Sequence, residues 1–485
     1  MRKTKIICTI GPATDPPEVM RSLIEAGMNV ARLNFSHGTY KEKAERIQNL
    51  CALREEMGVP LALLADTRGP EIRLGKFPDG PVRLREGQTF TLVAADIEGD
   101  ERRAGVSYPG LPADVCVGGH LMLDDGLIDL RVEGKTDTEI ACTVLNGGKI
   151  SSYKGVNAPG VKLRLPFITS QDRADLRFIA QHPFSYVAAS FTRTAEDIRS
   201  LRDEITRHGA TDIKVIAKIE NAEGLRNIDA IMDVADGIMV ARGDLGVETP
   251  LEELPVLQKQ LIQNAYRRGM PVITATQMLE SMIKNPRPTR AETSDVANAV
   301  YDGTSAVMLS GETAAGAYPA EACACMARIA ERTERDIDYK KRFITRGHTE
   351  ENTITNAVAR AAVTIAHELN CQAILTMSET GRTARHVSKY RPDSPIIACT
   401  PNVSAYHQLS LIWGVSPLII PECEDMDTLT AVSMRTACSS GLLREGDIAV
   451  VTAGIPLGLS GATNLLKVIV TGEEIRYRHP AKSPL

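Results

Sequence analysis

The sequence contains no apolar run of the roughly 18 residues that a membrane-spanning helix needs, so no membrane span is expected. Its ten cysteines are scattered and include no C-x-x-C pair, which argues against a zinc site or a disulfide framework. The formal net charge is −5, so nothing points to a nucleic acid polymer as the main partner. The apolar part of the first residues is too short for a signal peptide. These absences favour a cytoplasmic protein.

Several common catalytic and nucleotide-binding motifs are also missing. There is no G-x-x-x-x-G-K-[ST] and no G-x-G-x-x-G, so a nucleotide would not be held by a P-loop or a dinucleotide fingerprint. There is no G-x-S-x-G nucleophile motif and no H-E-x-x-H metal motif. Any active site must therefore be sought in the way the chain alternates strands and helices.

Eight short, β-branched apolar runs alternate with helical patterns. They read KTKIICTIG, MNVARLNFSHG, PLALLADT, SYVAASF, KVIAKIE, GIMVARG, PVITATQ and SAVMLSG. Eight βα units over about 240 residues predict a (β/α)8 TIM barrel, and an open doubly wound sheet is the competing fold. Between KVIAKIE and GIMVARG, the segment GLRNIDAIMDVA predicts one amphipathic helix.

Two further segments interrupt or follow this alternation. Residues 70–170 are rich in glycine and alternate apolar with polar residues, which predicts a small β-barrel or sandwich inserted into the larger domain. From about residue 346, helical patterns alternate with AILTMS, PIIACTP, VSPLII and DIAVVTAG, which predicts an α/β open sheet. We therefore expect a barrel over 1–69 and 171–345, an inserted β-barrel domain over 70–170, and a C-terminal α/β domain over 346–485.

Charged residues follow two neighbouring strands of the predicted barrel. Lys218 and Glu220 are two apart and so lie on one side of a strand, and Asp244 follows the next strand. Ligands of such barrels bind where the strands end. The lysine and Glu220 could form a merely structural ion pair. Asp244 adds a second carboxylate, and two carboxylates with few other ligands suit Mg²⁺ that shares substrate phosphate oxygens.

Oxygen-bearing side chains follow the second and third strands. Arg32, Asn34 and Ser36 are spaced two apart, and Asp66 and Thr67 end the third strand. Asn34, Ser36, Asp66 and Thr67 offer ligands for a hard cation, although Ser36 could simply cap a helix. Thr276 ends the seventh strand as a hydrogen-bond donor or as an ordinary cap. The pattern indicates a metal-dependent barrel enzyme that acts on an anionic substrate.

Eight blocks in order resemble the pyruvate kinase family over essentially the whole chain. They are ARLNFSHG, DTRGPEIR, KGVNAPG, AKIENAEG, VARGDLGVE, TATQMLESM, PTRAETSDVANAV and MLSGETA. Arg68 and Ala158 differ from the lysine and leucine often found in these blocks, and neither is a ligating side chain. No C-terminal phosphohistidine-type domain is expected, unlike in some bacterial relatives.

The resemblance implies roles for the residues already singled out. Arg32 would grip the phosphate of phosphoenolpyruvate, and Lys218 would face the phosphoryl group in transfer. Glu220 and Asp244 would hold Mg²⁺ (or Mn²⁺). The substrate carboxylate would lie near the amides of Gly243 and Asp244 and near Thr276, which would also lie on the protonation route.

The resemblance also implies a second cation and a nucleotide. Asn34, Ser36, Asp66 and Thr67 would bind K⁺, and the glutamate at position 71 is typical of members that need K⁺. The phosphates of ADP or ATP would be contacted by Asn34, Phe35, Ser36, His37, Arg73 and Lys154. The inserted domain would close as a lid that excludes water. The family also implies a homotetramer and the last step of glycolysis.

A strand-to-helix turn in the C-terminal segment is a candidate phosphate site. Its polar residues and glycine are Thr376, Ser378, Thr380, Gly381, Arg382 and Thr383. A helix that begins in this way favours phosphate, although a plain capped turn is the alternative. In the family this turn binds an allosteric sugar phosphate or nucleotide, and the late loop 454–464 is expected to cover it.

Two other functions fit parts of the pattern. A lyase or aldolase could use Mg²⁺ and an enolate on the same barrel without ADP. A catalytically silent metabolite sensor could rely on the C-terminal site alone. Retention of Lys218, Glu220, Asp244 and Arg32 argues against the sensor, and dependence on ADP separates the lyase from the kinase.

Overall fold

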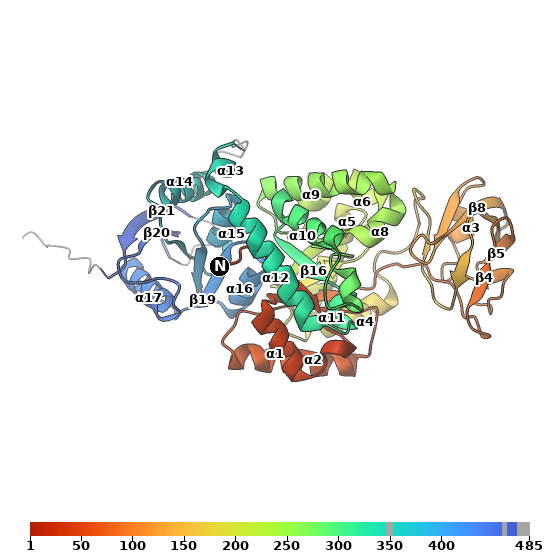
Figure 1. Cartoon of the computed structure of the whole chain (residues 1–485), viewed down its shortest axis with the longest axis horizontal. Helices are drawn as coiled ribbons and strands as arrows, with labels where there is room; N and C mark the ends of the chain where they lie inside the picture. The colour runs from red at the N-terminus through yellow and green to blue at the C-terminus, as the bar shows by residue number, and fades with distance from the viewer. Residues whose placement is uncertain (346–352, 458–462, 473–485) are drawn as a thin grey trace, which may run out of the picture. The chain divides into compact units, whose positions relative to one another are not determined.

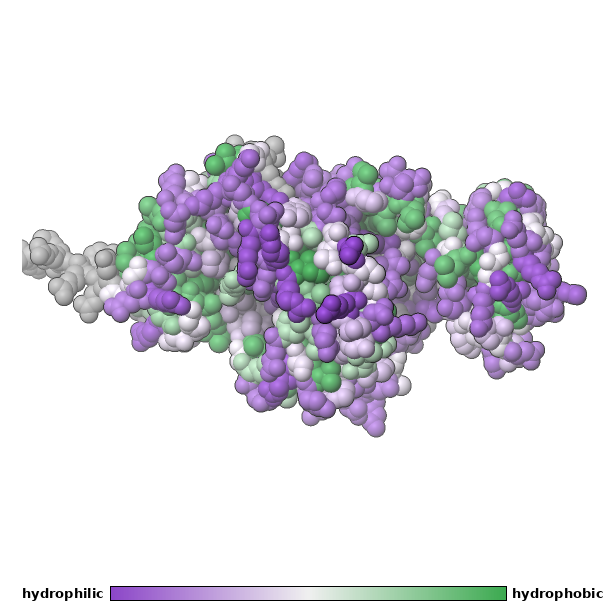
Figure 2. Space-filling view, in the orientation of Figure 1, coloured by the Kyte–Doolittle hydropathy of each residue, from purple (hydrophilic) through white to green (hydrophobic). Residues whose placement is uncertain are grey.

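The computed structural model describes residues 1–345, 353–457 and 463–472. These residues form two compact units. One comprises 5–266 and 270–330, and the other comprises 1–4, 267–269 and the residues from 331 onward. Among the described residues, no helix is long and apolar enough to cross a membrane. The face of the molecule seen in Figure 2 is mostly polar, with scattered apolar residues.

The first unit contains a closed barrel of eight parallel strands. Each predicted apolar run supplies one of them, so the predicted (β/α)8 barrel is confirmed. Around the barrel the order is β1 (Lys5–Thr9), β16 (Ala306–Leu309), β15 (Val272–Ala275), β14 (Gly237–Ala241), β13 (Lys214–Ile219), β12 (Tyr186–Ala189), β3 (Ala62–Asp66) and β2 (Val30–Asn34).

Helices follow the strands of this barrel (Figure 1). The long ones are α1 (Pro17–Ala26), α2 (Tyr40–Glu56), α4 (Ser170–Ala180), α5 (Ala195–Arg207), α9 (Leu254–Arg268), α10 (Arg290–Asp302) and α12 (Pro319–Asp336). Shorter ones are η1 (Pro12–Thr14), α6 (Ala222–Arg226), α7 (Ile228–Met232), α8 (Arg242–Glu248), η2 (Leu251–Glu253), η3 (Glu280–Ile283) and α11 (Gly311–Ala314).

The single helix predicted for residues 224–235 is wrong, because the chain forms two short helices, α6 and α7, that break at Asn227. The side chain of Asn227 donates a hydrogen bond to the Arg193 carbonyl at 2.9 Å. This long-range bond ties the break to the loop before α5. Apolar periodicity within the segment cannot reveal a contact with a residue so far away in the sequence.

The pleat of each strand decides which side chains face the surrounding helices. In β13, Val215, Ala217 and Ile219 pack into the large apolar core shared with the helices. Because successive side chains point to opposite faces, Lys218 points into the barrel. The same parity holds in β2, β3 and β12, so Arg32, Asp66 and Ser190 also lie on the inner side. The barrel thus gathers polar groups where these four strands end.

The inserted segment forms a sheet domain with its own apolar core. Its six-stranded sheet has the order β11 (Val156–Asn157), β7 (His120–Leu123), β8 (Ile128–Lys135), β9 (Glu139–Val144), β5 (Thr89–Val93) and β6 (Arg103–Gly105). A second sheet pairs β10 (Gly148–Ile150) with β4 (Val82–Leu84), and α3 (Leu111–Asp114) is a single turn. The domain boundaries given above stay a prediction.

The second unit contains a five-stranded sheet with the order β19 (Val415–Ile419), β18 (Ile396–Thr400), β17 (Ala373–Met377), β20 (Ile448–Ala453) and β21 (Leu465–Val470). Only β21 is antiparallel, and it was not predicted. The accompanying helices are α13 (Tyr339–Thr345), α14 (Ile354–Glu368), α15 (Arg382–Lys389), α16 (Val403–Gln408), η4 (Leu409–Leu411) and α17 (Met426–Ser439). Alternate residues of β17 pack against α14 and α15 on one face and α17 on the other.

Candidate active site

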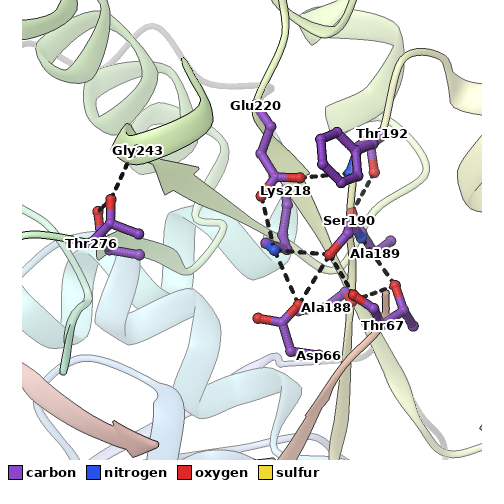
Figure 3. A network of polar contacts seen from close by, with 12 residues as sticks. Asp66, Thr67, Ala188, Ala189, Ser190, Thr192, Lys218, Glu220, Gly243 and Thr276 are labelled. Carbon is purple, nitrogen blue, oxygen red and sulfur yellow. Dashed lines mark hydrogen bonds and ion pairs between the residues drawn. The ribbon is translucent and has the colours of Figure 1, made fainter. Parts of the chain in front are cut away.

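Lys218 is the centre of a buried polar network at the carboxyl ends of the barrel strands (Figure 3). Its ammonium lies 2.8 Å from Glu220 Oε1, 3.1 Å from Asp66 Oδ1 and 2.8 Å from Ser190 Oγ. Burial alone would lower the pKa of this lysine, but the Asp66 and Glu220 carboxylates outweigh burial and raise it. The side chain is therefore held as a cation.

Asp66 joins this lysine to a second cation. Its Oδ2 accepts a hydrogen bond from Arg32 Nε at 2.7 Å, and Arg32 Nη1 donates to Thr9 Oγ1 at 2.9 Å. Burial opposes the charge on Asp66, which is only 1% exposed, yet Arg32 and Lys218 together hold its pKa below the usual value. Two cations and a carboxylate therefore meet beneath the strand ends, as an anionic substrate would require.

Glu220 and Asp244 provide the two carboxylates predicted to hold a divalent metal ion. Glu220 Oε2 accepts a 2.6 Å hydrogen bond from the backbone N–H of Phe191. Asp244 lies in the first turn of α8, directly after β14. Burial and then the charge of Glu220 raise the pKa of Asp244 to about 7. A pair of carboxylates that repel each other in a buried site suits a divalent cation, because the cation would offset both charges.

Thr276 lies beside this acidic pair. The Gly243 N–H donates to Thr276 Oγ1 at 2.8 Å, and this hydroxyl donates to the Ala275 carbonyl at 2.5 Å. Thr276 and Gln277 both have left-handed backbone angles, with φ of 70° and 52°. Arg242 Nε donates to the carbonyls of Ala275 and Thr276, each at 3.2 Å. Long-range contacts thus hold the strained turn that presents the threonine.

The four residues predicted to bind K⁺ are partly engaged with protein groups. Asn34 Oδ1 accepts a bond from the Ser36 N–H at 2.9 Å. Thr67 Oγ1 donates to the Ala188 carbonyl at 3.2 Å and accepts from the Ser190 N–H at 3.1 Å. Asp66 already meets two protein cations. Among the residues that the structure describes, no group of three or more His, Cys, Asp or Glu side chains could hold a metal ion.

The predicted nucleotide-binding residues differ in what they can offer a ligand. Phe35 is buried against Phe178 and Phe184, so its ring belongs to the core and only its backbone could contact a ligand. Burial and then the Arg73 guanidinium lower the pKa of His37, so it is favoured in its neutral form.

The two basic residues of the inserted segment that were predicted to contact the nucleotide are both paired with carboxylates. Arg73 forms two bonds to Glu71 Oε2, at 3.0 Å from Nε and 2.7 Å from Nη2. Lys154 Nζ lies 2.7 Å from Asp124 Oδ1. An incoming phosphate would have to compete with these two carboxylates.

The predicted C-terminal site is a cavity of about 360 Å³ in the second unit. Ser378, Thr380, Arg382 and Thr383 line it. Gly381 has a φ of 69°, and a Cβ there would come within 2.9 Å of the Leu409 side chain, so this turn requires glycine. The residues 458–462 of the late loop lie outside the described residues. The adjoining Leu457 and Thr463 line the cavity, and Thr463 Oγ1 is 2.9 Å from Thr383 Oγ1.

Sequence reasoning missed the turn that follows β12. Ser190 and Phe191 connect Lys218, Glu220 and Asp66, yet no charged residue precedes Arg193 in this stretch to mark it. The sequence did carry one signal for Ser190. This serine lies at the end of a predicted strand, which is the position that singled out Glu220. Thr9 was missed for the same reason. A barrel with a lysine, an arginine and several carboxylates gathered at its strand ends is typical of an enzyme that acts on an anionic substrate.

Comparison with known proteins narrows this class to one family. Residues 1–323 match the model of the pyruvate kinase barrel domain, and residues 356–469 match that of the pyruvate kinase alpha/beta domain. The chain is 49% identical to a pyruvate kinase of Geobacillus stearothermophilus over 97% of this chain and 81% of that protein. It is 45% identical to one of Clostridium acetobutylicum over 97% of this chain and all of that protein.

A solved structure supports the same assignment. A pyruvate kinase from Cryptosporidium parvum superimposes with a TM-score of 0.91 at 39% identity, covering 97% of this chain and 96% of that one. The chain belongs to the pyruvate kinase family.

Proposed function

We propose that the carboxyl edge of the barrel is where this chain transfers the phosphoryl group of phosphoenolpyruvate to ADP, giving pyruvate and ATP. Membership of the family makes the chain a kinase that acts on phosphoenolpyruvate, and the assignment of residues is our proposal. The observation that carries it is the buried Lys218 ammonium, which is kept charged between Asp66 and Glu220. A fixed buried cation stabilises negative charge that develops during transfer.

The substrate would be held by groups from several strands. Arg32, which is 8% exposed and oriented by Asp66 and Thr9, binds the phosphate of phosphoenolpyruvate. The amides of Gly243 and Asp244 and the hydroxyl of Thr276 face the substrate carboxylate. Thr276 also lies on the route by which the enolate carbon receives its proton. Holding the reactants in line supplies much of the rate in such reactions, and the rigid strand ends suit this purpose.

Glu220 and Asp244 are the residues that would hold Mg²⁺ or Mn²⁺. When bound, such an ion neutralises charge on the phosphoryl and enolate oxygens. The raised pKa of Asp244 supports this choice, because burial and the nearby charge of Glu220 disfavour a carboxylate there unless a cation offsets it. Asn34, Ser36, Asp66 and Thr67 would hold K⁺, with Glu71 as the family feature that accompanies a K⁺ requirement.

The nucleotide phosphates would be contacted by Arg73 and Lys154 of the inserted segment and by residues 34–37. Phosphate oxygens would replace Glu71 as the partner of Arg73 and Asp124 as the partner of Lys154. The inserted domain would act as a lid that keeps water from the phosphoryl group. A sugar phosphate or nucleotide would bind the C-terminal cavity as an effector. A homotetramer is proposed from the family alone, and a cytoplasmic location is proposed from the scattered cysteines.

An omission assay tests this function. Purified chain is mixed with phosphoenolpyruvate, ADP, Mg²⁺ and K⁺, and pyruvate and ATP are measured together, with each component then left out in turn. We expect pyruvate and ATP in equal amounts and neither product without ADP or the divalent ion. Pyruvate formed without ADP would favour a lyase or a hydrolase and would contradict the proposal.

A further inference from the structure

We propose that Ser190 is a positioning residue that fixes the Lys218 ammonium for phosphoryl transfer. This inference rests on the function proposed for Lys218. Ser190 follows β12 and is 1% exposed. Figure 3 shows its side chain between Lys218, Asp66 and Thr67. The hydroxyl accepts a bond from the ammonium at 2.8 Å and lies 2.7 Å from the Thr67 carbonyl.

The three acceptors around the ammonium are not equivalent. An ammonium has three N–H donors, and Asp66, Glu220 and Ser190 each lie within 3.1 Å of Lys218 Nζ. Asp66 and Glu220 are carboxylates that we assign to cations. Ser190 is the neutral acceptor, and we assign no cation to its hydroxyl. It is therefore suited to hold the lysine while the carboxylates change partners.

The backbone around Ser190 is itself tightly fixed. Its N–H donates to Thr67 Oγ1 at 3.1 Å, and the following residue, Phe191, has a left-handed φ of 55°. The Thr192 hydroxyl closes the turn on the Ala189 carbonyl at 2.8 Å. A Cβ built on Gly69 would come within 3.0 Å of Ser190 Cβ, so the neighbouring chain approaches closely. A strained conformation that many contacts determine is typical of a functional position.

The same turn also fixes Glu220. The Phe191 N–H donates to Glu220 Oε2 at 2.6 Å, while Glu220 Oε1 lies 2.8 Å from the ammonium. Ser190 and Phe191 thus set the two ends of the Lys218–Glu220 pair relative to each other. A displacement of about 1 Å in such a group can reduce a rate about 100-fold. Loss of the Ser190 hydroxyl should therefore act on catalysis rather than on substrate binding.

A double-mutant cycle tests the inference with the full chain. Ser190→Ala should lower kcat about 10- to 100-fold with little change in KM for phosphoenolpyruvate. In a Lys218→Met background, the same change should have no further effect on the residual rate, because Ser190 acts through the lysine. Ser305→Ala is the matched control. Ser305 is also buried, and its hydroxyl accepts from the Val272 N–H at the opposite end of the strands.

The control should keep the wild-type kcat even if its melting temperature falls. If Ser190→Ala does not fold, Ser190→Cys keeps the volume with a weak acceptor and should show the same fall in kcat. A wild-type kcat in a folded Ser190 variant would overturn the inference, as would an equal fall in both backgrounds. Full activity of Lys218→Met alone would instead contradict the function proposed for the lysine.

Discussion

Replacing Asp66 by asparagine should destabilise the barrel strongly, because this carboxylate neutralises two buried cations. Asp66 accepts from Arg32 Nε at 2.7 Å and lies 3.1 Å from Lys218 Nζ. Hydrogen bonds to charged groups are worth about 1.5–3 kcal/mol each. Removing one partner of a buried ion pair costs about 3–5 kcal/mol, because the remaining charge is left uncompensated. Glu220 still faces the lysine and compensates part of its charge. We therefore expect Asp66→Asn to lower the free energy of unfolding by about 3–5 kcal/mol.

Calorimetry of the purified chain in buffer free of K⁺ and Mg²⁺ would measure this effect. Each kcal/mol shifts the melting temperature of a domain of 150–250 residues by about 2–4 °C, so Asp66→Asn should lower it by several degrees. Asp15→Asn is the matched control, because Asp15 pairs with Arg46 but its side chain is 46% exposed. Such a pair is worth at most about 1 kcal/mol. Equal small shifts for both variants would refute the reasoning.

Three further predictions concern cations, pH and the effector cavity. Replacing K⁺ by tetramethylammonium should lower kcat sharply, and equal rates in both salts would contradict the inference from Glu71. Burial raises the pKa of Glu248 in the folded chain to about 7, whereas a glutamate in the unfolded chain has a pKa near 4.3. The folded state therefore loses stability as the pH rises from about 4.3 to about 7, because the unfolded chain gives up this proton first. Glu248→Gln should therefore melt higher than the wild type at pH 8 but not at pH 4, and equal differences in melting temperature at both pH values would contradict the raised pKa. Sugar phosphates or nucleoside monophosphates should shift the phosphoenolpyruvate saturation curve, and Arg382→Ala should weaken the shift. No shift with any of them would favour a plain capped turn.

Local patterns were sufficient to predict the barrel and part of its site. The eight apolar runs predicted all eight strands, because short β-branched runs between helical patterns are a local signal. Period-two spacing predicted that Lys218 and Glu220 lie on the same side of one strand. The same rule cannot say which side chains from other strands will meet them. The Arg32–Asp66 pair and the Ser190–Lys218 bond depend on barrel closure.

Other features depend on long-range contacts that leave little local signal. The segment RGDLGVE contains two glycines, yet it forms α8 and places Asp244 in the first turn. The break at Asn227 depends on a carbonyl 34 residues away. The run LLKVIV forms the last strand, β21, through antiparallel pairing with β20. The sequence of the run does not show that this partner exists. Ser190 and Thr9 were not predicted, because serine and threonine at a strand end also cap ordinary turns.

The most direct test of the account is the rate of phosphoryl transfer in Lys218→Met. The substitution removes the ammonium between Asp66 and Glu220 and keeps an unbranched side chain of similar length. Loss of one group that stabilises developing charge costs on the order of 10²–10³ in rate. ATP formation from phosphoenolpyruvate and ADP should fall by at least this factor in a variant that keeps its fold by circular dichroism. A folded variant that makes ATP at the wild-type rate would contradict the central role given to this lysine.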